Sequence, residues 1–353
     1  MSRNIRRKPA TLSDVAATIG VAPMTVSRVI NGNGYVSEET REKVLEAVKK
    51  MNYRRNGLAR NLKRQRTDTV GLVIGDISNP FSTELANAVR ESLSARGYNL
   101  FICISEHSAK EDIAAFESFV DHNIDGIIVA TRSNEEGDER LNEIADSGVP
   151  IVVVGRDFRH ESVDSISADN FTGGFEATQH LIDLGHNRIG FIGAGFENRS
   201  RLKRLQGYLS ALTKHGIQID ERLITGRRDS SRDTPGYSTE AIGYEGMKRL
   251  LSLPIRPTAV FARNDFTAVG AISAAKEAGL RIPQDIAIVG FDDTPLAVHT
   301  TPPLTTVRQP MKLQGQLAAE MLLRRISGEA EDTTEKRILD CELIIRESTV
   351  AQS

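Results

Sequence analysis

The chain has 353 residues, of which 39% are hydrophobic and 26% charged, an ordinary globular composition with room for two or three domains. It lacks a run of about 18 apolar residues, and its basic first residues lack the apolar stretch of a secretory signal, so we expect a cytoplasmic protein without a membrane-spanning segment. Cys103 and Cys341 lie far apart and form no C-x-x-C pattern, which argues against a disulfide framework or a zinc site.

Charge is divided unevenly along the chain. The formal net charge is -2, but residues 1–66 hold 15 Lys and Arg against 5 Asp and Glu, a net charge of +10. The remainder holds 30 basic and 42 acidic residues, a net charge of -12. A basic block joined to an acidic body indicates a polyanionic partner for the N-terminal part, with a merely solvated basic tail as the alternative.

Three short helices are predicted near the N-terminus. Thr11 and Asp14 have the spacing of a capping box, and Gly20 can end the helix that follows. A second helix is predicted over residues 23–31 and a third from residue 37. Two short helices joined by a tight turn and braced by a third form a helix-turn-helix unit, although a small helical bundle would show the same pattern. The expected inner stripe of the third helix comprises Val44, Leu45, Val48 and Met51.

The second of these helices has an unusual outer face, with short hydroxyls and one guanidinium where Glu and Lys are usual. In helix-turn-helix geometry this helix enters the DNA major groove, with its first residues nearest the base edges. Arg28 can donate to guanine O6 and N7, and Met24 can contact a thymine methyl group. Thr25 and Ser27 can bond bases or phosphates. Together with the basic charge, this face favours DNA binding over a plain bundle.

The next stretch, NYRRNGLARNLKRQRTDT, is strongly basic. Leu58, Ala59 and Leu62 have helical spacing, but they are too few for a core, and Gly57 weakens a helix by about 1 kcal/mol relative to Ala. The stretch is therefore either a flexible charged linker or a hinge that folds when it binds DNA.

The segment 11–63, with its V-S-R-V-I-N core and its N-x-x-A-R-x-L hinge, resembles the DNA-binding head of the lactose/galactose repressor (LacI/GalR) family, and the resemblance covers nearly the whole chain. It implies a homodimer whose paired hinge helices enter the minor groove of double-stranded DNA at the centre of a near-palindromic operator, with Leu62 wedged between base steps. Pro23 departs from the polar or aromatic residue that the family often has there. The expected DNA-contacting residues are Thr11, Pro23, Met24, Thr25, Ser27, Arg28, Asn31, Tyr53, Arg60, Leu62 and Lys63.

Residues 68–353 alternate apolar strands with helical patterns, which predicts α/β architecture with doubly wound parallel sheets covered on both faces. We expect strands within 69–77, 99–105, 126–131, 151–156, 188–194, 258–263 and 286–293, and helices near 81–96, 109–122, 171–184, 201–215, 237–252, 265–278 and 311–327.

The expected domains are a helix-turn-helix domain (1–55), a hinge (56–67) and a ligand-binding and dimerisation body (68–353). Because the strand series restarts midway, the body divides into an N-subdomain (about 68–165 plus 310–333) and a C-subdomain (about 166–309 plus 334–353), with the late segments crossing between them. The resemblance implies the two-lobed form of periplasmic binding proteins, with a ligand in the cleft.

Polar residues follow several expected strands, at the sheet edge where such folds bind ligands. Arg156, Asn170 and Phe171 occupy such positions. Carboxylates, amides and guanidinium groups bond hydroxyls, and a Phe face packs on ring C–H groups, so the set suits a sugar. Helix capping or bonding between subdomains is the alternative for each residue, and for Asp265 and Asp293 we expect capping of the helix or turn that follows.

The resemblance implies further ligand-binding residues. Phe81 would stack on a sugar ring, Arg204 and Asp292 would be polar anchors, and Asn264 would bond another hydroxyl. The function implied is that of a transcriptional repressor whose operator affinity depends on a small sugar-like effector. A nucleobase corepressor or a protein co-regulator are alternatives, and a solute-binding transport protein is the least favoured one.

Signatures of catalysis are missing from the sequence. It contains neither a G-x-x-x-x-G-K-[ST] phosphate loop nor a G-x-S-x-G nucleophile turn. Carboxylate spacing around Asp292 and Asp293 does not complete a metal site. We therefore expect no enzymatic activity, no metal and no cofactor.

Overall fold

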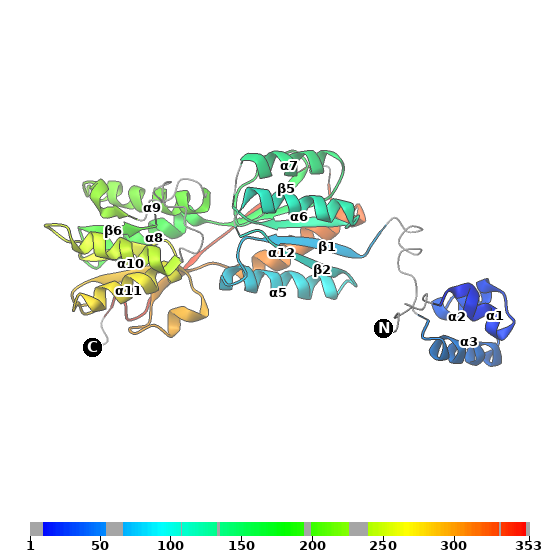
Figure 1. Cartoon of the computed structure of the whole chain (residues 1–353). Coiled ribbons are helices and arrows are strands. Elements are labelled where there is room, and N and C mark those ends of the chain that lie inside the picture. Colours follow the sequence, from blue (N-terminus) through cyan, green and yellow to red (C-terminus); the bar gives the residue numbers. More distant parts are fainter. Residues whose placement is uncertain are drawn as a thin grey trace, which may run out of the picture. The chain divides into compact units, whose positions relative to one another are not determined.

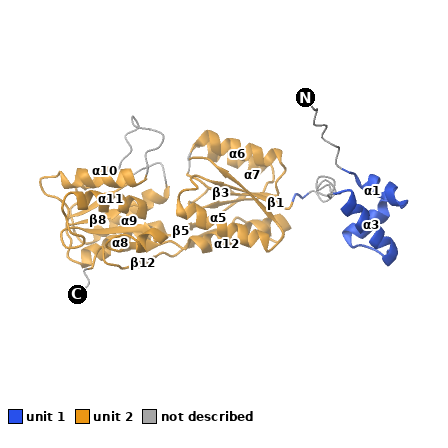
Figure 2. Cartoon of the chain, turned by 60° about the horizontal axis from the view of Figure 1, so that its bottom comes forward, with its two compact units in different colours: residues 1–67 blue, residues 68–353 orange. Residues whose placement is uncertain are grey.

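The computed structural model describes residues 10–53, 66–106, 108–132, 135–193, 199–225, 239–331 and 333–350. The chain forms two compact units, residues 1–67 and residues 68–353 (Figure 2). Within the described ranges, every helix is too short or too polar to cross a membrane.

The first unit contains the three predicted helices, α1 (Leu12–Ile19), α2 (Pro23–Asn31) and α3 (Glu38–Lys50). The capping box at the start of α1 is present, since the Thr11 side chain and the Asp14 side chain each accept from the other residue's backbone N–H. Gly20 ends α1 in the left-handed conformation, with φ 68. The three helices and the contacts at the ends of α1 confirm the predicted helix-turn-helix unit.

One small apolar core holds these helices together. Its buried residues come from all three helices, but Leu45, expected in the inner stripe of α3, is 51% exposed. Val44 faces inward, and the positions three and four residues on are Ala47 and Val48, so residue 45 is rotated away from the core. The prediction for Leu45 was wrong. The buried set is Val15, Ala16, Val26, Val29, Val44 and Ala47.

The second unit contains two sheets of six strands each (Figure 1). The sheet of the N-subdomain has the order β11-β5-β4-β3-β1-β2 with every pairing parallel. Helices α5 and α12 cover one face and α6 and α7 the other. Its elements are β1 (Thr69–Ile74), α5 (Pro80–Ser94), β2 (Asn99–Ile104), α6 (Ala109–Asp121), β3 (Gly126–Ala130), α7 (Glu135–Asp146), β4 (Ile151–Val154), β5 (Val163–Ala168), α12 (Met311–Ser327) and β11 (Lys336–Leu339).

The sheet of the C-subdomain repeats this plan with the order β12-β10-β9-β8-β6-β7, and only β12 is antiparallel to its neighbour. Helices α8 and α9 pack together on one face and α10 and α11 on the other. Its elements are α8 (Asn170–Asp183), β6 (Ile189–Ile192), α9 (Arg199–Lys214), η1 (Glu221–Leu223), β7 (Ile224–Thr225), α10 (Thr239–Leu251), β8 (Ala259–Ala262), α11 (Asp265–Glu277), β9 (Ala287–Asp292), η3 (Pro295–Val298), β10 (Thr305–Arg308) and β12 (Glu342–Ile344).

The chain crosses between the two sheets three times, after β5, after β10 and after β11. Strand β5 runs to Ala168 and β11 covers 336–339, so the N-subdomain extends beyond the expected boundaries at 165 and 333. The polar sequence VDSISA did not suggest a strand. All six residues are nevertheless buried. The carboxylate of Asp164 accepts from Arg325 Nε at 2.8 Å and Nη2 at 2.7 Å, which offsets the cost of burying its charge.

Strands β7, β10, β11 and β12 and helix α7 were also not predicted from the sequence. The sequence of α7, EEGDERLNEIAD, is highly charged, and its apolar face is only a narrow stripe. Leu141 and Ile144 are buried against the sheet, while the acidic residues of its first turn lie at the positive end of the helix.

Candidate functional site

The outer face of α2 is exposed, as the sequence predicted for a DNA-reading helix. Met24 is 64% exposed, and Arg28 and Asn31 are also exposed. Asn31 Nδ2 donates to Ser27 Oγ at 3.1 Å, which links two of the expected contact residues, while Thr25 is half-buried beside them. Pro23 occupies the first helical position, after the exposed cap residue Ala22. The face therefore offers a methionine, a guanidinium, an amide and hydroxyls to a partner.

Two other expected DNA contacts have structural partners in the first unit. Thr11 Oγ1 donates to Asp14 Oδ2 at 2.7 Å, and Tyr53 packs against the apolar core. Tyr35, which the sequence analysis did not single out, is 94% exposed in the loop between α2 and α3. An aromatic residue inside the turn sequence NGNGY was the available signal. Arg60, Leu62 and Lys63 lie outside the described residues.

In the second unit, Arg204 on α9 is the centre of the best-defined polar cluster. Helices α8 and α9 pack backbone against backbone because Gly174 and Gly207 carry no side chain at the crossing. A Cβ on Gly174 would meet the Arg204 carbonyl, and one on Gly207 would meet the backbone of α8. This close approach brings the guanidinium of Arg204 to the first turn of α8.

The buried guanidinium of Arg204 has several partners. Its Nε donates to Asn170 Oδ1 at 2.8 Å, and its Nη1 donates to the Arg263 carbonyl at 2.5 Å. Nη1 also lies 3.4 Å from Asp292 Oδ1, and the group stacks 3.7 Å from the ring centroid of Phe291. Burial lowers the pKa of Arg204, and the charge of Asp292 opposes that effect. The structure thus brings together three predicted ligand residues, Asn170, Arg204 and Asp292.

Asp292 ends strand β9 in an unusual backbone conformation, with φ 112. Its Oδ1 accepts from Gln309 Nε2 at 2.6 Å, and Gln309 lies on the segment that crosses from β10 to α12. Burial raises the pKa of Asp292, while Arg204 lowers it. The carboxylate therefore joins the arginine cluster to a crossing segment between the subdomains.

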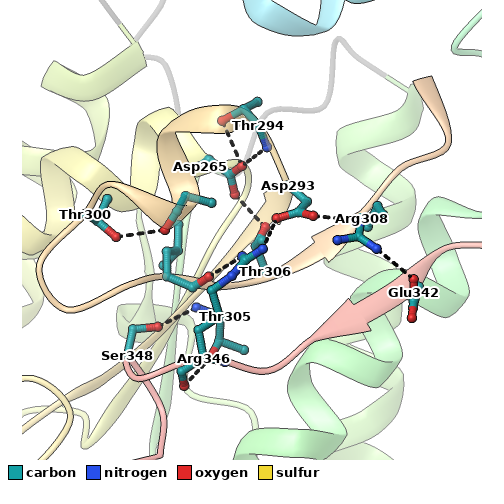
Figure 3. Close-up of polar contacts among 12 residues, drawn as sticks. Asp265, Asp293, Thr294, Thr300, Thr305, Thr306, Arg308, Glu342, Arg346 and Ser348 are labelled. Carbon is teal, nitrogen blue, oxygen red and sulfur yellow. Dashed lines mark hydrogen bonds and ion pairs between the residues drawn. The ribbon is translucent and has the colours of Figure 1, made fainter. Parts of the chain in front are cut away.

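Asp265 and Asp293 are structural, but not as the caps that we expected (Figure 3). Asp265 Oδ2 accepts from the backbone N–H of Thr294 at 2.7 Å, and its Oδ1 accepts from the Thr306 hydroxyl at 2.5 Å. Asp293 bridges Arg308 Nε and Arg346 Nη2, each at 2.7 Å. The two carboxylates face residues from distant segments, which no local capping pattern could reveal.

The cap of α11 is the neighbouring residue, Asn264. Its Oδ1 accepts from the Thr267 backbone N–H at 3.0 Å and from the Thr267 hydroxyl at 2.6 Å. The side-chain oxygen that we expected to bond an effector hydroxyl therefore caps this helix, which was the alternative role considered for it.

The remaining predicted ligand residues differ in their surroundings. Arg156 is 6% exposed and forms a bidentate ion pair with Asp138 on α7, at 2.6 and 3.1 Å. Phe81 is half-buried in the first turn of α5 beside Gly155, and Phe171 is 40% exposed in the first turn of α8. The two phenyl rings thus keep a free surface, whereas the guanidinium of Arg156 is held by a carboxylate.

Helix α9 also bonds the N-subdomain. The Ser200 hydroxyl donates to the Gly155 carbonyl, and Lys203 Nζ lies 2.6 Å from Asp157 Oδ2. Arg204 follows on the same helix. A ligand that binds its guanidinium would therefore contact a helix that already bonds both subdomains.

Two arginines of this cluster, Arg132 and Arg201, were not recognised from the sequence. Arg132 follows β3, and Arg201 lies in the first turn of α9. Burial and then the charges of Arg263, Arg132 and Arg204 hold the pKa of Arg201 well below its ordinary range. The signal for Arg132 was its position just past a strand.

A surface hollow of about 570 Å³ lies elsewhere, along α5. It contains none of the seven predicted ligand residues, and its polar lining includes two carboxylates, Glu84 and Glu91, with Lys312. The arginine cluster, and not this hollow, combines the features expected of an effector site.

Each of the two units matches a known protein family. The family described as "Bacterial regulatory proteins, lacI family" matches residues 11–56, and the one described as "Periplasmic binding protein-like domain" matches residues 178–349. The HTH-type transcriptional regulator DegA of Bacillus subtilis (strain 168) is 37% identical over 340 residues, which are 96% of this chain and 98% of DegA. The ribose operon repressor of Escherichia coli (strain K12) is 37% identical over 319 residues, 90% of this chain and 93% of that protein.

Solved structures show the same architecture. A crystal structure of the lac repressor dimer bound to operator and the anti-inducer ONPF has a TM-score of 0.83 and 28% identity, covering 98% of this chain and 100% of that chain. A complex of the transcriptional regulator CelR with cellobiose has a TM-score of 0.70 and 34% identity, covering 96% and 99%.

Proposed function

The chain belongs to the lacI family of bacterial regulatory proteins and is therefore a DNA-binding transcriptional regulator rather than an enzyme, and from this premise we propose that it is a cytoplasmic repressor controlled by a small sugar-like effector. Its operator is a near-palindromic sequence of double-stranded DNA. The observation that carries the proposal is the outer face of α2, whose Met24, Arg28 and Asn31 are exposed while Val26 and Val29 hold the helix to the core.

Major-groove recognition by this face explains its composition. Arg28 donates to a guanine, Met24 contacts a thymine methyl group, and Thr25, Ser27 and Asn31 bond bases or phosphates. Because Pro23 and Met24 offer few hydrogen bonds, their share of the specificity comes from apolar contact and shape. Thr11 and Tyr53 support DNA binding indirectly, because Thr11 caps α1 and Tyr53 packs against the core of the head.

The hinge supplies the minor-groove part of the interface. In a dimer, the paired Leu62 side chains wedge between the central base steps, and Arg60 and Lys63 contact the flanking phosphates. An operator with two half-sites follows from the twofold symmetry of such a dimer.

A second copy of the chain is the partner of strand β2, at the edge of the N-subdomain sheet. Phe101, Ile102 and Ile104 on this strand are between 43% and 50% exposed, and an exposed apolar edge strand invites pairing or burial. The similar lac repressor structure is a dimer, and a dimer of this chain that associates through β2 would cover this edge.

The effector binds at the arginine cluster between the subdomains. Arg204, Asp292 and Asn170 are its polar contacts, Phe81 and Phe171 pack on its ring, and Arg156 and Asn264 hold the surrounding framework. An effector can shift operator affinity only if it binds the two arrangements of the subdomains differently. Contacts of α9 with Gly155 and Asp157 support this coupling, because they join the residue that holds the effector to the N-subdomain.

The proposal is tested by selecting operators from random DNA with the purified full-length protein, and then screening compounds for changes in operator affinity. We expect a twofold-symmetric sequence and at least one sugar, sugar acid or sugar phosphate that changes the affinity. An effector that proves to be a nucleobase, or a response only to a protein partner, would establish one of the alternatives. A protein without sequence preference would contradict the proposal.

A further inference from the structure

Helix α12 buries one polar side chain, that of Gln314, in its first turn. Every other buried residue of α12 is a glycine, an alanine, a leucine or a methionine. Gln314 is 0% exposed, and within the described part of the chain neither its Oε1 nor its Nε2 has a hydrogen-bond partner. A buried amide without partners loses the hydrogen bonds that water would give it, so this side chain opposes folding unless a ligand binds it.

Gln309, five residues earlier, shows how the chain holds a buried amide that serves the fold. It is 7% exposed, and its Nε2 donates to Asp292 Oδ1 at 2.6 Å. Asp292 in turn lies 3.4 Å from Arg204 Nη1. The amide of Gln309 is thus part of a polar network, whereas the amide of Gln314 is part of no such network among the described residues.

The packing of α12 places Gln314 at the carboxyl edge of the N-subdomain sheet. Near the other end of the helix, Leu322 packs against Gly126, the first residue of β3. Arg325 bonds Asp164 near the start of β5. Gln314 precedes Leu322 by about 12 Å of helix, and β3 spans about 16 Å, so Gln314 lies beside the ends of the strands. At this edge open α/β sheets bind their ligands.

The side chain of Gln314 is directed towards the boundary between the subdomains. Side chains on a helix point back towards its N-terminus, and α12 begins just after the crossing segment that carries Gln309. Phe81 lies beside Gly155 on the same edge of the sheet, and the Gly155 carbonyl accepts from Ser200 of the C-subdomain. The amide of Gln314 and the ring of Phe81 therefore belong to the edge that meets the other subdomain.

We propose that Gln314 is a further effector-binding residue, whose amide binds two neighbouring hydroxyls of a neutral sugar ring. This inference rests on the proposed function, because it adds a contact to the same effector. A primary amide has two N–H donors and an acceptor oxygen, and a hydroxyl can both donate and accept, so two adjacent hydroxyls satisfy both ends of the amide. Because Gln314 is 0% exposed, the sugar binds after the residues that cover the amide have moved.

This contact would let the sugar bond both subdomains. Arg204 and Asp292 belong to the C-subdomain, whereas α12 belongs to the N-subdomain. A ligand that bonds groups on both sides favours the arrangement that brings them together, and so shifts the equilibrium between arrangements of the subdomains.

The variant Gln314→Met tests the inference without any ligand. Methionine is close to glutamine in size and helix propensity but carries no amide. Loss of the unpaired group should raise the thermal unfolding midpoint of the full-length protein by about 2 °C or more. Gln316→Met replaces an exposed glutamine of the same helix and should leave the midpoint unchanged. A midpoint of Gln314→Met equal to or below that of the wild type would overturn the inference, because the amide would then serve the fold.

Titration calorimetry with D-ribose, D-glucose and cellobiose tests the contact itself. We expect at least one of the three sugars to bind the wild type. Gln314→Met should bind that sugar at least about tenfold more weakly, which corresponds to about 1.4 kcal/mol. Gln316→Met should bind it as the wild type does.

Deoxy analogues of the bound sugar, each lacking one hydroxyl, complete a double-mutant cycle. An analogue without a hydroxyl that contacts Gln314 should bind the wild type more weakly than the parent sugar, but should bind Gln314→Met as well as the parent sugar does. The other analogues should lose affinity by the same factor with both proteins.

Three binding results would overturn the inference: no binding of any of the three sugars, equal affinity of Gln314→Met and the wild type, or equal factors in both proteins for every analogue. Each would leave the proposed function intact, since its own test rests on operator selection and a wider set of compounds. Conversely, a sugar contact at Gln314 in a protein that lacks operator preference would contradict the proposed function alone.

Discussion

The two units of this protein prepare their binding surfaces in opposite ways. On the head, Met24, Arg28 and Asn31, which we propose to meet DNA, are exposed side chains on one helix. In the body, three candidate effector residues, Asn170, Arg204 and Asp292, are buried, and Arg204 bonds both of the others. An exposed face can be stable without its partner because water solvates it, whereas a buried polar cluster must satisfy its charges and hydrogen bonds within the protein.

The largest effect on stability is expected when Asp292 is removed from the buried cluster of the body. The variant Asp292→Ala leaves the buried guanidinium of Arg204 without its countercharge, and we expect the free energy of unfolding of the body to fall by about 3–5 kcal/mol. Urea unfolding measures the change. Asp285→Ala, which removes a surface carboxylate paired with Arg281, is the control and should cost far less. Equal losses in the two variants would mean that the cluster is not stabilised by its carboxylate.

Asp265 contributes to the pH dependence of the body's stability. Its pKa is about 7 in the fold, above the ordinary value of 3.8, so between these values the folded state binds more protons than the unfolded state. Stability should therefore fall as the pH rises from about 4 to about 7. Asn at this position can still accept from Thr294 and can donate to Thr306, so Asp265→Asn should flatten the profile. Urea unfolding at several pH values checks this, and an unchanged slope in the variant would refute it.

A substitution of Arg28 tests the exposed face of α2 on the head. Arg28→Ala should weaken binding to the preferred operator by about 1–3 kcal/mol and relax the base preference at one position, without unfolding the head. Fluorescence anisotropy against a panel of operator variants measures both effects. Lys43→Ala on α3 removes another exposed cation and should leave the base preference unchanged. A uniform loss over all sequences for Arg28→Ala would make Arg28 a phosphate contact.

Lys63 should have the smallest effect. Lys63→Ala should reduce the slope of log affinity against log salt by about one phosphate contact. Titrations at several salt concentrations give the slope. If it stays as in the wild type, Lys63 does not contribute to the interface.

The sequence predicted the head more completely than the body for a physical reason. Capping, helical spacing and turn glycines act over a few residues, so Thr11, Gly20 and the stripe of Val26 and Val29 could be recognised directly. Leu45 was the exception, because its rotation from the core depends on the packing of α3 as a whole.

In the body, strand and helix alternation predicted two doubly wound sheets, but not helix α7 or the strands β5, β7, β10, β11 and β12. The partner of Asp164 in β5 is Arg325, 161 residues later in the chain, and such a pair leaves no local pattern. For the same reason, the sequence could nominate Arg204 and Asp292 but could not separate Asn264, a helix cap, from the effector contacts. Arg132 and Arg201 could not be recognised either, because they lie near the other arginines only in the folded chain.

The three crossings between the sheets also constrain how the body can be made and altered. The N-subdomain sheet lacks its last strand, β11, until residue 339 has been synthesised, long after the C-subdomain strands β6 to β10 are complete. Neither subdomain corresponds to one continuous piece of the gene. A recombination event that joins two such genes at a single point within the body would therefore exchange parts of both subdomains, whereas one near residue 67 would exchange the head alone.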